Sequence, residues 1–324
     1  MKHLTRIVGL ALLLSLLSGV FAQDIVLRAA DNQPEDYPTT QGLFFMADYL
    51  NQRSGGRIQM EVFPGGQLGD ERSVIEQVQL GVIDITRTST SPVGEFYAPI
   101  GVFSLPYIFR NEAHFWKVLQ GPIGRELLDG LADSDLVGLA YYDSGSRNFY
   151  TTEVPIRSVA DLEGLRIRTQ QSQIVLDMME ALGAEPVPMA FAEVYSSLQT
   201  GVIDGAENNF PSYGPSGVRH YEVAPFFTLD GHARVPEVVL ISSIVWDGLS
   251  TEDQTLIREA AQASVAVQAA LWDALSDASR TAVVEAGSEI IMVDTQEFQD
   301  AMGPLYEQYG AAYGDLLERI LAVE

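Results

Sequence analysis

The hexapeptide Gln79-Leu80-Gly81-Val82-Ile83-Asp84 recurs with one change as Gln199-Thr200-Gly201-Val202-Ile203-Asp204. Each copy follows a stretch whose apolar residues have helical spacing, residues 71–80 and 192–200. In each copy the glycine stands where the C-terminus of a helix favours a left-handed residue, and the Val-Ile pair after it is typical of the start of a strand. The same helix–glycine–strand unit therefore occurs twice. We expect two similar α/β lobes; a chance match between two short segments is the alternative.

Other segments of the chain alternate between strand and helix patterns. Strand patterns occupy residues 24–30, 57–63, 136–142 and 165–169, and helical patterns occupy residues 42–51 and 174–182. Such alternation predicts α/β lobes with mainly parallel strands, whose carboxyl ends form the usual place for a ligand.

A long helix is predicted near the C-terminus. Ser250-Thr251-Glu252-Asp253 has the pattern of a helix N-cap with an acidic residue at the third position, and no glycine or proline follows until after Ala286. At 1.5 Å per residue such a helix reaches roughly 50 Å, longer than either lobe. We expect it to run along both lobes as a spine, with a kinked pair of helices as the alternative.

The first 22 residues have the layout of a secretory signal peptide. Lys2 and Arg6 precede the apolar residues 7–20, and Val20-Phe21-Ala22 provides a cleavage site before Gln23. The apolar run is too short to span a bilayer, which takes roughly 20 residues. We expect cleavage near Ala22 and secretion through the inner membrane; a buried N-terminal helix is the alternative.

Composition narrows the class of protein further. The chain has no cysteine, so it carries neither disulfides nor the cysteine by which bacterial lipoproteins are anchored. A soluble exported protein of this kind fits the periplasm. With 44 acidic residues against 19 lysines and arginines, the net charge is −25, and such a surface repels nucleic acid and anionic membranes. We therefore expect no nucleic-acid partner.

Motifs of enzymes are missing from the sequence. There is no thiol, the four histidines have no HExxH spacing, and no G-x-S-x-G elbow occurs. The glycine-rich stretch Gly65–Gly69 runs into Asp70 and Glu71, which would repel a phosphate. The sequence therefore predicts neither an enzyme nor a cofactor or metal site.

Two arginines are candidates for binding an anion. Arg168 lies in the strand pattern 165–169, and Arg147 lies in 144–148, where the chain would leave the first lobe. A guanidinium matches a carboxylate with two parallel hydrogen bonds and keeps its charge when desolvated. The two could hold one carboxylate from the edges of a cleft, and ordinary surface salt bridges are the alternative.

Five stretches, in order along the chain, carry a resemblance to a known family. From residue 24 to about residue 286 the chain resembles the substrate-binding proteins of tripartite ATP-independent periplasmic (TRAP) transporters, DctP type. The stretches are Phe63–Gly69, Leu105-Pro106-Tyr107, Asp161–Arg168, Pro188–Tyr195 and Leu198–Asn208.

The resemblance implies a two-lobed, clamshell-like α/β fold of the periplasmic-binding-protein kind, with mixed sheets and a long spine helix. Lobe I is expected to comprise residues 23–145 plus 234–273, and lobe II residues 146–233 plus 274–324. The resemblance further implies a monomeric, periplasmic solute-binding protein that closes on an organic acid and delivers it to TRAP membrane permease subunits.

The resemblance also implies roles for individual residues. Arg168 matches the family arginine that forms the main salt bridge to the ligand carboxylate, Arg147 a second arginine, Asn208 a supporting amide, and Phe191 an aromatic packed on the ligand. In members that bind sugar acids, the hydroxyl-reading positions correspond here to Asn32, Glu71 and Ser89.

The loop at residues 31–38 resembles members that bind hexuronates such as glucuronate or galacturonate, and Glu71 with Arg72 suits a polyol. A metal site is not implied, because Asn208 stands where the metal-dependent members have tryptophan. Alternatives stay open: Phe191 as core, Ser89 as a cap, and Arg72 paired with Asp70 or Glu76.

Two other classes of function remain as alternatives. One is a periplasmic hydrolase acting on acidic sugars, and the other is the receptor of an ABC importer or a sensor with the same fold.

Overall fold

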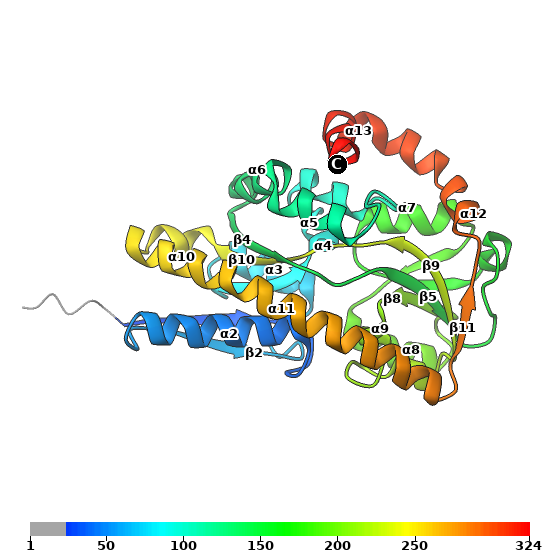
Figure 1. Ribbon diagram of the computed structural model, residues 1–324, viewed down its shortest axis with the longest axis horizontal. Coiled ribbons are helices and arrows are strands. Elements are labelled where there is room, and N and C mark those ends of the chain that lie inside the picture. Colours follow the sequence, from blue (N-terminus) through cyan, green and yellow to red (C-terminus); the bar gives the residue numbers. More distant parts are fainter. Residues whose placement is uncertain (1–23) are drawn as a thin grey trace, which may run out of the picture.

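The computed structural model describes residues 24–324. The proposed signal peptide, residues 1–22, lies outside these residues and stays a prediction. In the described part, two sheets lie end to end with helices packed around them, and one long helix runs along both (Figure 1). None of the helices described is long and apolar enough to cross a membrane.

The described residues form twelve α-helices and five short 3-10 segments. They are α2 (Pro38–Arg53), α3 (Glu71–Gln79), α4 (Thr90–Val93), α5 (Glu112–Gln120), α6 (Pro122–Gly130), α7 (Gln173–Ala181), α8 (Val194–Gln199), α9 (Phe210–Tyr213), α10 (Ser243–Asp247), α11 (Thr251–Glu285), α12 (Thr295–Asp300) and α13 (Gly303–Ala322), with the 3-10 segments η1 (Ala98–Ser104), η2 (Leu131–Ser134), η3 (Val159–Leu162), η4 (Phe191–Glu193) and η5 (His220–Glu222).

The first sheet has the order β2-β1-β3-β10-β4. Its strands are β1 (Ile25–Ala30), β2 (Ile58–Phe63), β3 (Ile85–Ser89), β4 (Leu136–Tyr142) and β10 (Glu237–Ser242). β1 runs parallel to β2 and β3, whereas β10 runs antiparallel to β3 and β4. The sheet is therefore mixed.

The second sheet is also mixed and has the order β11-β9-β5-β8-β6-β7. Its strands are β5 (Arg147–Thr151), β6 (Arg166–Thr169), β7 (Glu185–Pro188), β8 (Gly205–Asn208), β9 (Phe226–Ala233) and β11 (Glu289–Met292). β6 runs parallel to β7 and β8, as β1 does to β2 and β3, so the two sheets share a parallel three-stranded unit.

The repeated hexapeptide ends a helix and precedes a strand in both halves. Gly81 and Gly201 have positive φ angles of 67° and 71°, as predicted for a helix C-terminus. The prediction that Val-Ile opens a strand is wrong. In the first copy the amides of Val82 and Ile83 donate back to the Gln77 carbonyl at 2.9 and 3.3 Å, which closes the helix, and the second copy makes the same bonds to Ser197.

Each strand begins only after the repeated aspartate, because that side chain ties the helix end to the neighbouring strand. Asp84 accepts the backbone amide of Arg28 in β1 at 2.7 Å, and Asp204 accepts that of Arg166 in β6 at 2.9 Å. β3 and β8 follow directly. The repeat is thus a helix end joined to a strand clamp, used once in each sheet.

The long helix α11 is continuous over its 35 residues, so the kinked pair does not occur. Its N-cap Ser250 accepts the amide of Asp253 at 3.1 Å, as the sequence predicted. α11 packs beside α2 on the first sheet and reaches α9 in the second half (Figure 1). Buried side chains on both helices cover one face of the first sheet: Leu43, Met46 and Leu50 from α2, and Ile257, Ala260 and Ala261 from α11.

Two short segments, residues 143–146 and 234–236, join strands of the two sheets, and they are hydrogen-bonded and ion-paired to each other. Ser144 donates to the Val235 carbonyl at 2.7 Å, and Arg234 pairs with Asp143. Gln268 of α11 bridges the Asp143 backbone with bonds of 2.8 and 3.1 Å. The segments and the spine helix therefore meet at one place between the halves.

The strands of the first sheet all lie within the ranges proposed for lobe I, residues 23–145 and 234–273. The strands of the second sheet all lie within those proposed for lobe II, residues 146–233 and 274–324. However, α13 packs against η1 and α6 as well as α7, so the C-terminal helix contacts both halves. The division of the chain into the two lobes given above stays a prediction.

Candidate functional site

Two adjoining cavities lie between the sheets. The outer one has a volume of about 250 Å³ and the inner one about 20 Å³, enough for about one water molecule. Both are lined from the two halves, and the residues they share are Asn32, Glu71, Arg168, Gln170 and Phe191. The outer volume is close to the lower end of the range for small-molecule sites, roughly 300 Å³.

A larger cavity of about 720 Å³ lies elsewhere, between α5, α6, β4 and α11. Its lining comes from the first half alone, so closing the two halves could not enclose a ligand there. Arg258 on its wall already donates to the Gly138 carbonyl at 3.2 Å. The cavities between the sheets are the better candidate for a ligand site.

Arg168 is buried without an acid to pair with. It is 3% exposed, and its Nε and Nη2 both donate to the Met189 carbonyl at 3.1 and 2.9 Å. Among the described residues, no carboxylate oxygen lies within 4.0 Å of it. Burial lowers the pKa of Arg168 from its usual value, which reflects the cost of holding this charge away from water. A buried cation of this kind is poised to bind an anion.

Phe191 packs beside this arginine on the cavity wall. The Arg168 guanidinium lies 5.8 Å from the centre of its ring, close enough for a cation–π contact. The ring also meets the edge of His220, whose Nδ1 is bonded to the Tyr150 hydroxyl at 2.7 Å. Burial lowers the pKa of His220 to about 3, so this histidine is neutral and adds no second positive charge beside Arg168.

Arg147 lies in the same wall, but Glu207 already occupies one edge of its guanidinium. Nη2 donates to Glu207 Oε1 at 2.8 Å and to the Glu207 carbonyl at 3.0 Å, and Nε pairs with Oε2. Burial alone would lower the pKa of Arg147, but the Glu207 carboxylate raises it above its usual value. Only Nη1 has no partner among the described residues, as in Arg168, but the charge of Arg147 is already compensated by the Glu207 carboxylate, so Arg147 attracts an incoming carboxylate less than Arg168 does.

Glu207 is also linked to a buried histidine. His232 Nε2 lies 3.4 Å from Glu207 Oε2, and its Nδ1 lies 2.6 Å from Asp230. Burial would raise the pKa of Glu207, but Arg147 and His232 lower it to about 2. Burial would lower the pKa of His232, but Asp230 and Glu207 raise it to about 9. The four side chains form one buried charge network behind the cavity.

The raised pKa of His232 predicts a loss of stability in alkali. Its protonated form is favoured in the folded state, so the contribution is fully present below about pH 6.5, declines as the pH rises, and is lost above about pH 9. The change is on the order of 3 kcal/mol in the free energy of unfolding. Urea denaturation at pH 6.5 and 9.5 measures it.

In that experiment His232→Gln should remove most of the difference between the two pH values. His114→Gln is the matched control, because burial lowers the pKa of His114, so its titration raises stability with pH instead of lowering it. If the free energy of unfolding changed by the same amount between pH 6.5 and 9.5 in the wild type and in His232→Gln, the loss of stability in alkali could not be assigned to His232.

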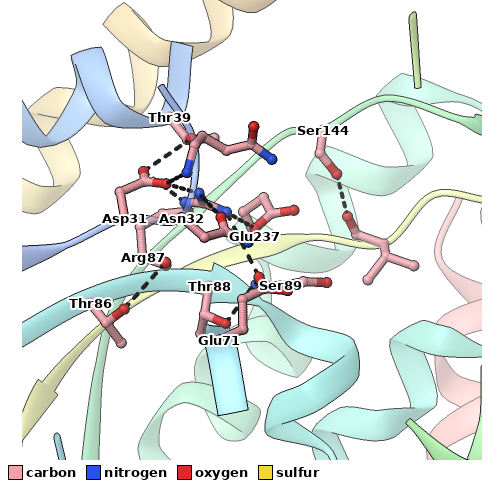
Figure 2. Close-up of polar contacts among 12 residues, drawn as sticks. Asp31, Asn32, Thr39, Glu71, Thr86, Arg87, Thr88, Ser89, Ser144 and Glu237 are labelled. Carbon is pink, nitrogen blue, oxygen red and sulfur yellow. Dashed lines mark hydrogen bonds and ion pairs between the residues drawn. The ribbon is translucent and has the colours of Figure 1, made fainter. Parts of the chain in front are cut away.

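The first half contributes a third buried arginine, Arg87, to the inner cavity. Figure 2 shows it among acids and amides: its Nε and Nη2 bond to Asp31, its Nη1 to Glu237 at 2.7 Å, and its Nη2 to Asn32 at 2.7 Å. Burial lowers its pKa. Every nitrogen of this guanidinium that can donate is already engaged, so Arg87 organises the wall and cannot bind a ligand carboxylate in the way Arg168 can.

Glu71 is held at the start of α3 against β3. Its Oε1 accepts the backbone amide of Ser89 at 2.9 Å and the Thr88 hydroxyl at 3.2 Å (Figure 2). Burial, together with the nearby Glu237, raises the pKa of Glu71. Both glutamates line the inner cavity.

Two asparagines present amide donors to the same space. Asn32 Oδ1 accepts from Arg87, and Asn208 Oδ1 accepts the backbone amide of Asn209 at 2.9 Å. These bonds identify the oxygen of each amide, so the NH₂ group is the end left to donate. Both residues line the inner cavity.

Two of the predicted site residues lie outside the lining. Ser89 is the N-cap of α4 and accepts the Ser91 amide at 3.4 Å, and its hydroxyl contacts Gln170 of the other half at 3.5 Å. Arg72 is half exposed, pairs with Glu76 at 3.6 Å and lies over Phe96. The ligand roles given to these two remain untested, and the alternatives of a cap and a helix ion pair match the contacts they make.

Sequence reasoning missed Arg87 and Glu207, although the repeat could have found them. Each is the third residue after the repeated aspartate, so the two halves place opposite charges at equivalent positions. Ser89 and Asn209 are likewise equivalent, and both cap a short helix that borders the cavity. Glu237 lies outside both copies of the repeat, so the sequence offers no comparable signal for it. Within residues 24–324, no group of three or more histidine and acidic side chains is arranged to hold a metal ion.

The halves also touch across the cleft. The Tyr37 hydroxyl lies 2.8 Å from Ser212 Oγ and donates to Asn209 at 3.3 Å. The backbone amide of Gln173 donates to Glu95 at 2.8 Å. Both contacts join residues of the first half to residues of the second, and the contact of Tyr37 borders the inner cavity.

Solved structures similar to this chain are TRAP periplasmic solute-binding proteins. One from Xanthobacter autotrophicus Py2, with bound β-D-galacturonate, is 45% identical, covers 92% of this chain and 100% of its own, and has a TM-score of 0.89. Another from Pseudomonas putida F1, with bound D-glucuronate, is 42% identical, covers 93% and 98%, and has a TM-score of 0.90. The C4-dicarboxylate-binding periplasmic protein DctP of Rhodobacter capsulatus is 33% identical over 78% of this chain and 76% of its own.

The family model for bacterial extracellular solute-binding protein, family 7 (DctP) matches residues 29–312. The predicted two-lobed α/β class is confirmed by the similar solved structures. These relatives bind solutes and are not enzymes, which confirms that expectation for this chain and leaves the hydrolase without support. The chain belongs to the family 7 extracellular solute-binding proteins, the DctP-type binding proteins of TRAP transporters.

Proposed function

We propose that this protein binds a hexuronate, glucuronate or galacturonate, with the ligand carboxylate on Arg168. The observation that carries the proposal is the buried Arg168 guanidinium, which faces a cavity and has no acid within 4.0 Å among the described residues. Two relatives more than 40% identical over most of this chain were solved with hexuronates bound, which supports the same ligand class here.

The roles proposed for the other site residues follow from the donors, acceptors and aromatic ring that they present to the cavities. Arg147 Nη1 and the Asn208 amide support the carboxylate, and Phe191 packs on the ring of the sugar. Asn32 and Glu71 bond the hydroxyls from the first half. Ser89 acts through Glu71, whose oxygen its amide holds at 2.9 Å, and Arg72 has no direct part in the site.

The setting of this activity is part of the proposal. We infer that the signal peptide is removed near Ala22, that the mature monomer diffuses in the periplasm, and that it hands its ligand to the TRAP permease subunits. The family match and the periplasmic relatives support this setting.

A thermal-shift series tests the ligand class. At about 100 times Kd, a ligand stabilises the folded state by about 2.7 kcal/mol, which raises Tm by roughly 5 °C in a chain of this size. We expect that rise with D-galacturonate or D-glucuronate. D-galactose is the matched control, because it has the galacturonate ring with a neutral group in place of the carboxylate. Equal shifts for galactose and galacturonate would overturn the proposal.

A further inference from the structure

The inner cavity has chemically opposite ends. The second half contributes donors, from Arg168, Arg147 and Asn208. Beside the Asn32 amide, the first half contributes mainly acceptors: Gln33 Oε1 is buried on the cavity lining and has no hydrogen-bond partner within the described residues. A ligand in the adjoining outer cavity that reaches both sets of groups carries an anion at one end and donating hydroxyls at the other.

Two carboxylates at the acceptor end also have an oxygen to spare. Glu71 uses Oε1 for its bonds to the protein, and Glu237 uses Oε2 for Arg87. Neither Glu71 Oε2 nor Glu237 Oε1 has a partner among residues 24–324. Both side chains are mostly buried, 14% and 9% exposed, so water screens their charges little.

The charges at this end do not balance. Asp31, Glu71 and Glu237 surround one cation, Arg87, whose nitrogens are already engaged by Asp31, Asn32 and Glu237. A further anion placed here would meet excess negative charge and find no free guanidinium. Burial raises the pKa of Glu71, and the negative charge of Glu237 raises it further; this second effect is the same repulsion felt by a group of the protein itself.

We propose that Glu71 and Glu237 are specificity-determining residues that reject ligands with a second carboxylate, so that the site accepts monocarboxylate sugar acids and excludes aldarates and C4-dicarboxylates. The fold does not decide this property, because the family includes a relative named for C4-dicarboxylates. The inference rests on the proposed function, in which the first carboxylate binds Arg168. Glu237 has no role in that proposal and gains one here.

Calorimetric titration of the purified full-length protein tests the inference with ligands that differ by one charge. D-galactonate and galactarate are both open-chain acids of the same stereochemistry, with one and two carboxylates respectively. We expect galactarate to bind at least 100-fold more weakly than galactonate, about 2.8 kcal/mol by the tenfold rule. D-galacturonate is titrated in parallel.

Variants assign the effect to residues. Glu237→Gln and Glu71→Gln each remove one negative charge at nearly constant shape. In each variant the ratio of the affinity for galactonate to the affinity for galactarate should fall at least tenfold. Glu76→Gln is the matched control, because Glu76 lies on the same helix as Glu71 and is half exposed beside Arg72; its ratio should equal that of the wild type.

The outcomes separate the two proposals. Galacturonate binding with equal affinities for galactonate and galactarate overturns the inference and leaves the proposed function intact. Unchanged ratios in folded Glu237→Gln and Glu71→Gln overturn the assignment to these residues. Binding of no sugar acid by the wild type overturns the proposed function itself. If the variants do not fold, the wild-type ratio still decides whether a second carboxylate is rejected.

Discussion

Replacing Arg168 with alanine should weaken hexuronate binding at least 100-fold, about 2.8 kcal/mol by the tenfold rule. The variant removes the only buried guanidinium of the described site that has no acidic partner. The ligand carboxylate would then be desolvated without a charge opposite it, and breaking a buried ion pair in this way costs about 3–5 kcal/mol. Isothermal titration with D-galacturonate at pH 7.5 measures the loss.

Two further variants make the result specific. Arg168→Lys keeps the positive charge but loses the two-pronged geometry, so its affinity should fall between those of the wild type and Arg168→Ala. Arg166→Ala is the matched control from the same strand. Arg166 pairs with Asp204 at a partly exposed position outside the cavities, and exposed pairs contribute roughly 0–1 kcal/mol, so its affinity should change by about threefold or less. Near-equal affinities of Arg168→Ala and the wild type would refute the carboxylate assignment.

Glu207→Ala should be the most destabilising substitution near the site, by about 3–5 kcal/mol. It leaves Arg147 and the protonated His232 buried close together without the carboxylate that separates them. Arg147 would keep no acidic partner within 4.0 Å among the described residues, whereas His232 would keep Asp230. Urea denaturation at pH 7 measures the loss as a lower midpoint.

Glu185→Ala is the control for this experiment. Glu185 lies exposed on the edge strand β7, and surface substitutions of this kind usually change stability by about 0.5 kcal/mol or less. Glu207→Gln should lie between the two, since the amide keeps a hydrogen bond but not the charge. A Glu207→Ala midpoint equal to that of the wild type would show that the network does not hold the fold together.

The sequence was most informative where structure is local. The repeat around Gly81 and Gly201 predicted two related units because a helix end with a left-handed glycine depends on a few neighbouring residues. The N-cap at Ser250 and the absence of helix breakers predicted α11 nearly to the residue. The start of each strand was misplaced because the aspartate of the repeat bonds to another strand, a contact that no local pattern contains.

The two-lobed plan with its spine helix, and Arg168 as a candidate for binding a carboxylate, could therefore be derived from the sequence. Only the tertiary structure decided which arginine is free. Arg87, Arg147 and Arg168 are all buried, but the fold brings Asp31 and Glu237 to the first and Glu207 to the second, and no acid to the third. The charge available to a ligand depends on these long-range partners and on desolvation, and both arise only when distant segments come together.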